Sequence, residues 1–506
     1  MSALPTAAPQ QPVRRTEADL RAALGSVCWS AVAERLSQSV QEPLGLRRLR
    51  LEAARRLESL AEGTAPWPDN LRGYRAQMAG NLVQAAVQRA QEVLEVPAVA
   101  KASSATAGVA VAGAAEPAEA EACGPEAKQA FPGPDLQAWA QAGLVVAPAR
   151  LWWQQHPELA APFVPAEGQG WGWGQAAPGG GEAPGGPGLW SWLHAVLWED
   201  GYVLQVPQGA DAGSVLRLPA PAVRPGAWVS HFIRVGEGAN LQLVDESLFP
   251  LLAGSGRPGP GNPAAGTQIA SLAVWMWLGR RAQLDYTSAV AGPGPHAVGR
   301  QARLAEGARV GLNLLSLGGR RLEEVRLELE GEVGQSRLTW LVAGREGTLL
   351  ALHPQVVHRG RHTQSHVVVR TAAGAQAHVD MPAATYIRQG AAGARGYQRL
   401  QSLLLSPQAQ VEALPGLYID ENDVDAGHAA TASQFDEEQL YYLQSRGIPR
   451  EQAEELLLSG FFAPLLDEWQ PASLRERATR LLKDFWQPAP AAGPTGSAAS
   501  MAKEGL

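Results

Sequence analysis

Apolar and polar residues alternate with a period of two through residues 196–430, and this pattern restricts the possible folds more than any other feature. Segments that follow it include GYVLQVPQGA, WVSHFIRVGEGANLQLVDES, RLEEVRLELEGEV and SHVVVRTAAGAQAHVDM. No helix-length run interrupts them. Because alternate side chains of a strand share one face, the pattern predicts a long succession of β-strands.

A recurrent kernel, usually Gly and a small residue followed by alternation, marks the starts of these strands. It occurs as EGANLQL, RRAQLDY, EGARVGLNL, EGTLLAL, AGAQAHV and PQAQVEA, with successive copies roughly 26 to 43 residues apart. The segment AGSGRPGPGNPAAG is interpreted as an insertion. Imprecise repeats of this kind favour a β-solenoid. A β-sandwich or jelly roll is the alternative, because its strands have the same period.

Helical patterns flank the strand region. Residues 16–62 and 70–96 place Leu and Ala three and four apart, and Gly63 ends the first run. Asp436 begins a C-terminal group containing DEEQLYYLQSRG, REQAEELLLSGFFAPLLDEW and SLRERATRLLKDFW. An apolar seam is predicted there from Leu440, Leu443, Leu456, Leu457, Phe461, Leu465 and Trp469.

These patterns divide the chain into four parts. We expect an N-terminal helical region (1–195) with low-complexity linkers at about 100–135 and 166–188, a β core (196–430), a C-terminal helical domain (431–486) and a disordered tail (487–506). A short helical stretch is expected near residues 135–145.

Composition and missing motifs exclude several functions. The net charge of −7 argues against nucleic-acid binding. Cys28 and Cys123 form no CxxC pair, and no secretory signal or membrane-spanning stretch is visible, so we expect a soluble, cytoplasmic protein. The motifs GxxxxGK[ST], HExxH and GxSxG are absent, and there is no dinucleotide-binding glycine loop. The chain is therefore expected not to be an enzyme.

A histidine-rich stretch, HPQVVHRGRHTQSH, invites a metal interpretation. On a helix, spacing by four would align its imidazoles, but along a strand four residues span about 13 Å, too far for a shared ion. A hydrogen-bonded or solvated sheet face is the favoured interpretation. The histidines are His353, His358, His362 and His366.

Two features of the C-terminal part leave alternatives open. Between residues 420 and 470, twelve Asp or Glu accompany only Arg446 and Arg450, which indicates either a solvated helical face or a docking site for a basic partner. His428 lies among Ala and Gly at the junction of strand and helix. A lone histidine is usually structural, but these small neighbours leave its imidazole room to meet another chain.

The stretch from Tyr397 to Trp469 closely resembles the C-terminal part of the SufB/SufD family, proteins of the Suf system for iron–sulfur cluster assembly. The matching residues include Leu403 to Ser406, Pro415, Leu417, Asp423, Val424, His428, Ala430, Thr431, Tyr442, Leu443, Ser445 to Gly447, Ala453, Gly460 and Phe461. HTQSHVVVRTAAGAQAHVD and DGYVLQVPQGA extend the resemblance upstream, whereas the first 190 residues carry no family motif.

The resemblance implies a right-handed parallel β-helix flanked by N-terminal and C-terminal α-helical domains. It also implies a SufB-like partner bound through the β-helix and a SufC-like ABC ATPase bound through the C-terminal helices. On this basis Tyr442, Arg446, Phe461 and Phe462 are expected to contact the ATPase, and apo iron–sulfur proteins are indirect clients. No cofactor is expected on the chain alone.

Cysteine usage indicates which member of the pair the chain resembles. SufB members carry cysteines in the β-helix, but no cysteine follows Cys123 here, so the likeness is to SufD. In SufD-like proteins the histidine matching His428 faces a partner cysteine. We therefore expect His428 to contribute to a transient iron–sulfur cluster at the interface, as a possible metal ligand shared with the partner.

The chain departs from the family pattern at three positions. Ala426 replaces a frequent Cys, Asp425 a frequent basic residue, and Ala429 a Gly. A SufB-like scaffold is the nearer alternative. A more remote one is a polysaccharide-binding or polysaccharide-cleaving solenoid with carboxylates on one face, although Glu324, Glu328 and Glu330 are expected to form a solvated strand face.

Overall fold

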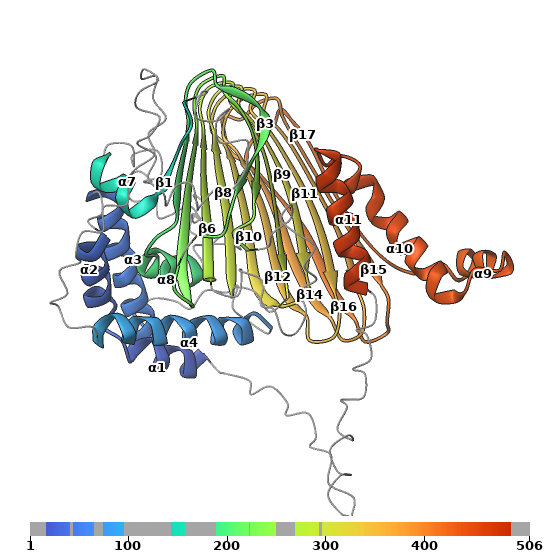
Figure 1. Ribbon diagram of the computed structural model, residues 1–506, viewed down its shortest axis with the longest axis horizontal. Helices are drawn as coiled ribbons and strands as arrows, with labels where there is room; N and C mark the ends of the chain where they lie inside the picture. Colours follow the sequence, from blue (N-terminus) through green and yellow to red (C-terminus); the bar gives the residue numbers. More distant parts are fainter. Residues whose placement is uncertain are drawn as a thin grey trace, which may run out of the picture.

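The computed structural model describes residues 17–40, 44–64, 74–95, 143–156, 189–221, 223–248, 269–292 and 296–486. They form a mainly β protein, in which a solenoid of parallel strands carries helices at both ends (Figure 1). The low-complexity linkers and the C-terminal tail expected from the sequence lie outside the described residues.

The strands form two sheets, and the chain alternates between them. Sheet A has nine strands in the order β1 (Val145–Pro148), β2 (Tyr202–Val206), β4 (Ala227–Val235), β6 (Ile269–Leu278), β8 (Ala297–Leu304), β10 (Arg320–Leu329), β12 (Leu349–His358), β14 (His378–Ile387) and β16 (Gln410–Ile419). Sheet B has eight, in the order β17 (Val424–Gln434), β15 (Ala394–Leu404), β13 (Gln364–Ala373), β11 (Gln335–Gly344), β9 (Arg309–Leu317), β7 (Gln283–Ala291), β5 (Asn240–Asp245) and β3 (Asp211–Leu218).

The pairing of these strands decides between the two folds expected from the sequence. From β2 onward, each strand pairs in parallel with the strand two positions later, while β1 and β2 are antiparallel. Antiparallel neighbours, which build sandwiches and jelly rolls, are limited to that one pair among the described strands. The solenoid is confirmed, and the sandwich alternative is wrong.

The recurrent kernel forms the corners of the solenoid. Gly238 and Gly307 take φ values of +64° and +66°, which glycine adopts without steric cost. Arg281 occupies the matching corner of another coil at φ +55°. The small residue that follows each corner, such as Ala239 or Ala308, is fully buried. The kernel therefore reflects a left-handed corner followed by a position with no room for a larger side chain.

The N-terminal helices cover the outer face of sheet A (Figure 1). They are α1 (Glu17–Gly25), α2 (Trp29–Val40), α3 (Leu44–Glu62), α4 (Tyr74–Glu95), α7 (Ala149–Gln155) and α8 (Leu189–Leu197). Phe232 on β4 contacts Trp153 and Trp198 edge to face, with ring centroids 5.2 and 5.6 Å apart. Gly63, at φ +76°, ends α3 as expected. α7, α8 and β1 were not predicted, and the helical stretch expected near 135–145 lies mostly outside the described residues.

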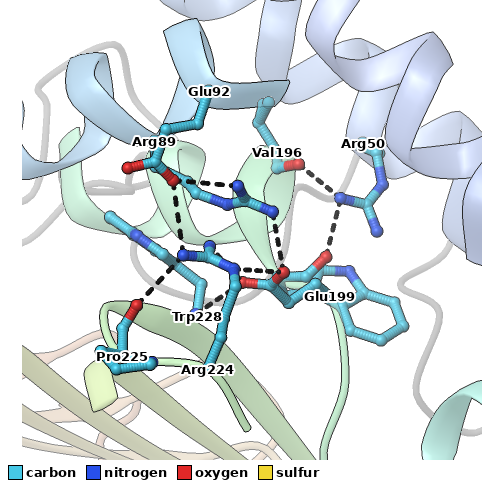
Figure 2. A network of polar contacts seen from close by, with 9 residues as sticks. Arg50, Arg89, Glu92, Val196, Glu199, Arg224, Pro225 and Trp228 are labelled. Atoms are coloured by element: carbon cyan, nitrogen blue, oxygen red, sulfur yellow. Dashed lines mark hydrogen bonds and ion pairs between the residues drawn. The ribbon is translucent and has the colours of Figure 1, made fainter. Parts of the chain in front are cut away.

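A network of charges also joins these helices to the solenoid (Figure 2). The Glu199 carboxylate accepts hydrogen bonds from Arg89 at 2.9 Å and from Arg224 at 2.7 Å. Glu92 pairs with the same two guanidinium groups at 3.1 and 3.4 Å. Because the two arginines share two carboxylates, α4 and the segments before β2 and β4 are held in one arrangement.

The fully buried Arg50 on α3 connects α3 to the end of α8. Its guanidinium donates to the backbone carbonyls of Val196 and Trp198, the latter at 3.0 Å, and lies 5.0 Å from the centre of the Trp198 ring (Figure 2). A cation at the C-terminal end of a helix satisfies carbonyl groups that lack helical partners.

One histidine is buried between α8 and sheet A. His194 Nδ1 lies 2.8 Å from Ser271 Oγ, and His194 Nε2 lies 3.0 Å from Ser230 Oγ. Trp190 Nε1 donates to Ser271 at 2.7 Å. Burial, with a smaller contribution from the charge of Arg50, lowers the pKa of His194 to about 3, so the imidazole is neutral.

The C-terminal helices are α9 (Glu437–Ser445), α10 (Arg450–Leu466) and α11 (Ala472–Trp486). α10 and α11 pack on the outer face of sheet B, whereas α9 extends away from the solenoid (Figure 1). The Asp436 side chain caps α9 by accepting from the backbone N–H groups of Glu438 and Gln439. The predicted seam is only partly correct. Phe461, Leu465 and Trp469 belong to the core on sheet B, whereas Leu440, Leu443 and Leu457 do not, and Leu456 is 53% exposed on the side of α10 that faces away from the sheet.

The carboxylates expected on a solvated strand face need a second correction. Glu324 and Glu328 are buried, while Glu330 is half-buried and lies 2.6 Å from Arg303. Glu328 accepts from Arg326 Nε at 2.6 Å. Glu328 and Glu330 are paired with arginines, and Glu324 is buried 3.4 Å from His353, so the three acids do not form the exposed carboxylate cluster that the polysaccharide hypothesis required. None of the described helices is long and apolar enough to cross a membrane.

Candidate functional site

The C-terminal end of the solenoid is open in the described structure. β16 is the last strand of sheet A and β17 the last of sheet B, and each pairs with one neighbour only, β14 and β15. Residues of β15 mostly alternate between buried and exposed, whereas residues of β17 are half-buried or exposed throughout. Unpaired edge strands present backbone donors and acceptors that another strand can use.

Large apolar side chains accompany this open end. Leu414, Tyr418 and Ile419 on β16 are 58%, 37% and 43% exposed. Tyr418 stacks on Tyr386 of the preceding coil, with ring centroids 4.8 Å apart. Among the described residues, exposed side chains of this size are few, so their concentration on the last strand of sheet A indicates an interaction surface.

His428 lies in the middle of β17, where its register partner is Gln398 on β15. Gln398 and Leu400 are buried, and Leu400 belongs to the core between the sheets. Parallel strands in register place side chains of paired residues on the same face. His428 therefore lies on the face that encloses the core, and it is exposed because no further coil covers it.

The residues around His428 are small on both faces. Ala426 pairs with Gly396 on the core side. A Cβ built on Gly427 would lie 3.5 Å from the Tyr397 ring on the outer side. Ala429 lies within the extended strand and is not among the residues with positive φ, so replacing Gly at this position imposes no backbone strain.

The second departure from the family pattern, Asp425, interacts within the chain. Its carboxylate accepts a hydrogen bond from the Tyr397 hydroxyl, and this hydrogen bond raises the pKa of Tyr397. The negative charge of Asp425 is thus directed at the outer face of sheet B, the face opposite to that of His428.

Polar side chains lie inside the solenoid beneath His428. Gln398 Nε2 donates to Thr385 Oγ1 and, at 3.2 Å, to the backbone carbonyl of Gly416 on β16. Gln398 Oε1 is buried, and no donor from the part of the chain that the structure describes bonds to it. The glutamine thus connects the penultimate coil to the last one through its nitrogen and leaves its oxygen unused.

Two histidines of the histidine-rich stretch are buried and lie within hydrogen-bonding distance of other side chains. His353 Nδ1 lies 3.4 Å from Glu324 Oε1. His358 lies 2.8 Å from both Thr363 Oγ1 and Ser365 Oγ, and burial lowers the pKa of His358 to about 4. The described residues contain no group of three or more His, Cys, Asp or Glu that could hold a metal ion. The favoured interpretation, a hydrogen-bonded sheet face, fits His353, whereas His358 lies inside the solenoid.

The four residues expected to contact an ATPase differ in accessibility. Tyr442 is 57% exposed and stacks beneath Arg446, whose guanidinium lies 5.2 Å from the ring centre. Phe461 is half-buried against Arg370, while Phe462 is 2% exposed within the core that joins α10 and α11 to sheet B. The structure therefore excludes Phe462 from any partner surface, because that side chain holds the helices on the solenoid.

α9 and α10 together form a shallow groove beside Tyr442. The groove has a volume of about 370 Å³ and is lined by Asp436, Glu438, Gln439, Tyr442, Leu443 and Leu457. Tyr441, on the same helix, is 74% exposed. Acidic and apolar side chains both line the groove, so it can take an apolar side chain with a basic neighbour.

The sequence alone did not reveal the residues that surround His428. Gln398, Thr385 and Tyr397 carry no motif, and their importance follows only from the strand register. Alternation in YQRLQSLLLS could have assigned Gln398 to the buried face, but not its placement beneath His428.

Comparison with known proteins gives the last observation on this site. Residues 223–461 match the model of the SufBD core domain of SUF system FeS cluster assembly. The chain is 37% identical over 139 residues to the iron–sulfur cluster assembly protein SufD of Bacillus subtilis, covering 28% of this chain and 31% of that protein.

Mycobacterial relatives give similar results. Identity is 31% over 161 residues with a SufBD family protein of Mycobacterium tuberculosis and 30% over 172 residues with one of Mycobacterium leprae. These alignments cover 30% and 32% of this chain, and 41% and 44% of the relatives. The chain thus aligns with less than half the length of each of these three relatives.

Proposed function

The chain belongs to the SufB/SufD family, and on that premise we propose that it is a SufD-type, non-catalytic subunit of a complex that assembles iron–sulfur clusters. The observation that carries the proposal is the position of His428, on an edge strand at the open end of the solenoid. An imidazole placed there can be shared with a second polypeptide. The cluster is the cargo of this complex, and it is passed on to apo iron–sulfur proteins.

The open end supports pairing with a SufB-like subunit. β16 and β17 offer unpaired backbone edges, and Leu414, Tyr418 and Ile419 offer apolar area beside them. Strand addition uses main-chain hydrogen bonds for affinity and side-chain contacts for specificity. A partner that continues both sheets would cover His428 and bring its own residues opposite the imidazole.

The chemistry of the end favours a shared site. His428 supplies one nitrogen ligand, and no cysteine follows Cys123 to supply a thiolate. Thiolate and imidazole are both competent iron ligands, so a partner cysteine would complete the set. This shortage of thiols favours a SufD-type over a SufB-like role.

The protruding α9 supports binding of a SufC-like ABC ATPase. The helix places Tyr441 and Tyr442 in solvent next to the acidic groove. Exposed tyrosines at the centre of a surface commonly supply much of the affinity of an interface. The ATPase would provide the phosphate-binding loop that this sequence lacks.

Co-expression with a SufB-like subunit and a SufC-like ATPase tests the proposal, with size-exclusion chromatography and iron and sulfide analysis as readouts. We expect one complex containing all three chains. The His428→Ala variant should retain the complex but lose most of the cluster.

His366→Ala is the matched control, because His366 is also an exposed strand histidine but lies on the outer face of β13, away from the open end. It should keep the wild-type cluster yield. A wild-type yield in His428→Ala would reject the site, and failure to retain either partner would reject the proposed function.

A further inference from the structure

The buried Gln398 beneath His428 has an arrangement that the packing of the solenoid does not require. Its side chain is 3% exposed, yet none of the described residues donates a hydrogen bond to its Oε1 atom. A buried acceptor without a donor costs free energy, and this one lies one coil below the exposed His428.

The nitrogen of the same amide fixes its orientation. Gln398 Nε2 donates to Thr385 Oγ1 and to the Gly416 carbonyl. A flip of the amide would direct the oxygen at the Gly416 carbonyl, which is itself an acceptor, and the donor bond would be lost. The oxygen is therefore held away from β16.

His428 lies on the strand that follows β15 in sheet B. It is the register partner of Gln398 on the following coil and lies on the same face. Neighbouring strands are about 4.8 Å apart, a separation that paired side chains bridge. The neighbouring pair, Gly396 and Ala426, adds at most a methyl group, so it leaves the imidazole free to turn toward Gln398.

We propose that Gln398 is a positioning residue for His428: its Oε1 accepts a hydrogen bond from one imidazole N–H, so that the lone pair of the other ring nitrogen faces the open end of the solenoid. Acceptors of this kind set the tautomer and direction of histidines that bind metals. The inference rests on the proposed function for its purpose, but the hydrogen bond itself concerns this chain alone.

The experiment uses the full chain labelled with ¹⁵N at histidine, with ring-nitrogen shifts recorded at pH 8 and His428→Ala to assign the signals. The measured quantity is the ratio of the two neutral tautomers of His428. We expect this ratio to be about five times that of free histidine, which is the factor that a hydrogen bond of about 1 kcal/mol gives. In Gln398→Met, which keeps length but removes the acceptor, this bias should disappear.

Two further variants separate orientation from folding. Ser402→Ala, at another buried polar position of β15, whose register partner is Ala432, should keep the wild-type tautomer ratio. Gln398→Asn keeps the amide but withdraws it by one methylene, so this variant should also lose the bias even if Gln398→Met does not fold. A wild-type ratio in folded Gln398→Met or in folded Gln398→Asn overturns the inference.

The cluster yield of the co-expressed complex is measured in parallel. A tautomer bias that depends on Gln398, in a chain that retains neither partner, would refute the proposed function while leaving the inference intact. A complex that assembles clusters normally while Gln398→Met shows no tautomer change would refute the inference alone.

Discussion

Gln398 and His428 are register partners on β15 and β17, yet the first side chain is 3% exposed and the second lies at the surface. The two positions differ in one respect, namely that a further coil covers the glutamine and none covers the histidine. The accessibility of His428 is thus a consequence of where the solenoid stops. A partner that continues the solenoid would bury the imidazole as β17 buries the amide.

Charge placed on the last strand of sheet A should block the SufB-like partner. In Leu414→Arg, a 58% exposed leucine becomes a cation, so the fold should be retained while an apolar contact is lost and a charge is desolvated. We expect affinity for that partner to fall by at least about tenfold, which corresponds to about 1.4 kcal/mol.

Val333→Arg is the control for this prediction. Val333 is 48% exposed but lies at a corner between β10 and β11, away from the open end. It should bind the partner like the wild type when both variants are compared by titration calorimetry. Equal affinities for the two variants would show that β16 takes no part in the interface.

Removing one aromatic side chain of the C-terminal helices should affect ATPase binding, and removing another should affect the stability of the fold. Tyr442→Ala removes an exposed side chain and should weaken ATPase binding by roughly 1–2 kcal/mol with little change in the free energy of unfolding. Phe462→Ala removes a buried side chain and should lower that free energy by about 3 kcal/mol. Urea unfolding of the single chain and a pull-down of the ATPase measure the two quantities. The assignment fails if Tyr442→Ala binds the ATPase normally.

The buried histidines should make the fold sensitive to acid. The pKa of His194 is lowered to about 3 in the folded state, against an ordinary value of 6.5 in the unfolded chain. Between these values the unfolded state binds more protons, so the free energy of unfolding decreases as the pH falls from about 6.5 toward 3. The same argument applies to His358, whose pKa is lowered to about 4.

Urea midpoints recorded between pH 4 and pH 8 measure this dependence. His194→Gln should be less stable at pH 8, because two serine contacts change, but its stability should decrease less steeply toward low pH. His366→Gln, at an exposed position, should keep the wild-type slope. Parallel profiles for wild type and His194→Gln would contradict the assignment of this acid sensitivity to His194.

The sequence predicted the solenoid because its two physical signals are local. Period-two alternation follows from strand geometry, and the kernel follows from corners such as Gly238 with a buried Ala239 behind it. The N-terminal helices and the capping of α9 by Asp436 are likewise local. The sequence could not show that Glu324 and Glu328 are buried, since a strand pattern does not reveal which other elements lie against its polar face.

The site was only partly predictable for a similar reason. His428 was recognised from its small neighbours and its family resemblance, but its exposure depends on β17 being the last strand. Gln398 pairs with His428 across 30 positions of sequence, and such pairs follow from strand register alone. Phe462 was misjudged because one face of α10 contacts sheet B and the other faces solvent, and the apolar pattern does not distinguish them.

The edges of β16 and β17, which lack a neighbouring strand on one side, have a consequence for the cell. A copy without a binding partner leaves the edges of β16 and β17 exposed to solvent, where they can pair with a second unbound copy or start aggregation. If the proposed complex forms, balanced synthesis of its subunits would limit such exposure, and surplus copies of this chain should be degraded faster than assembled ones.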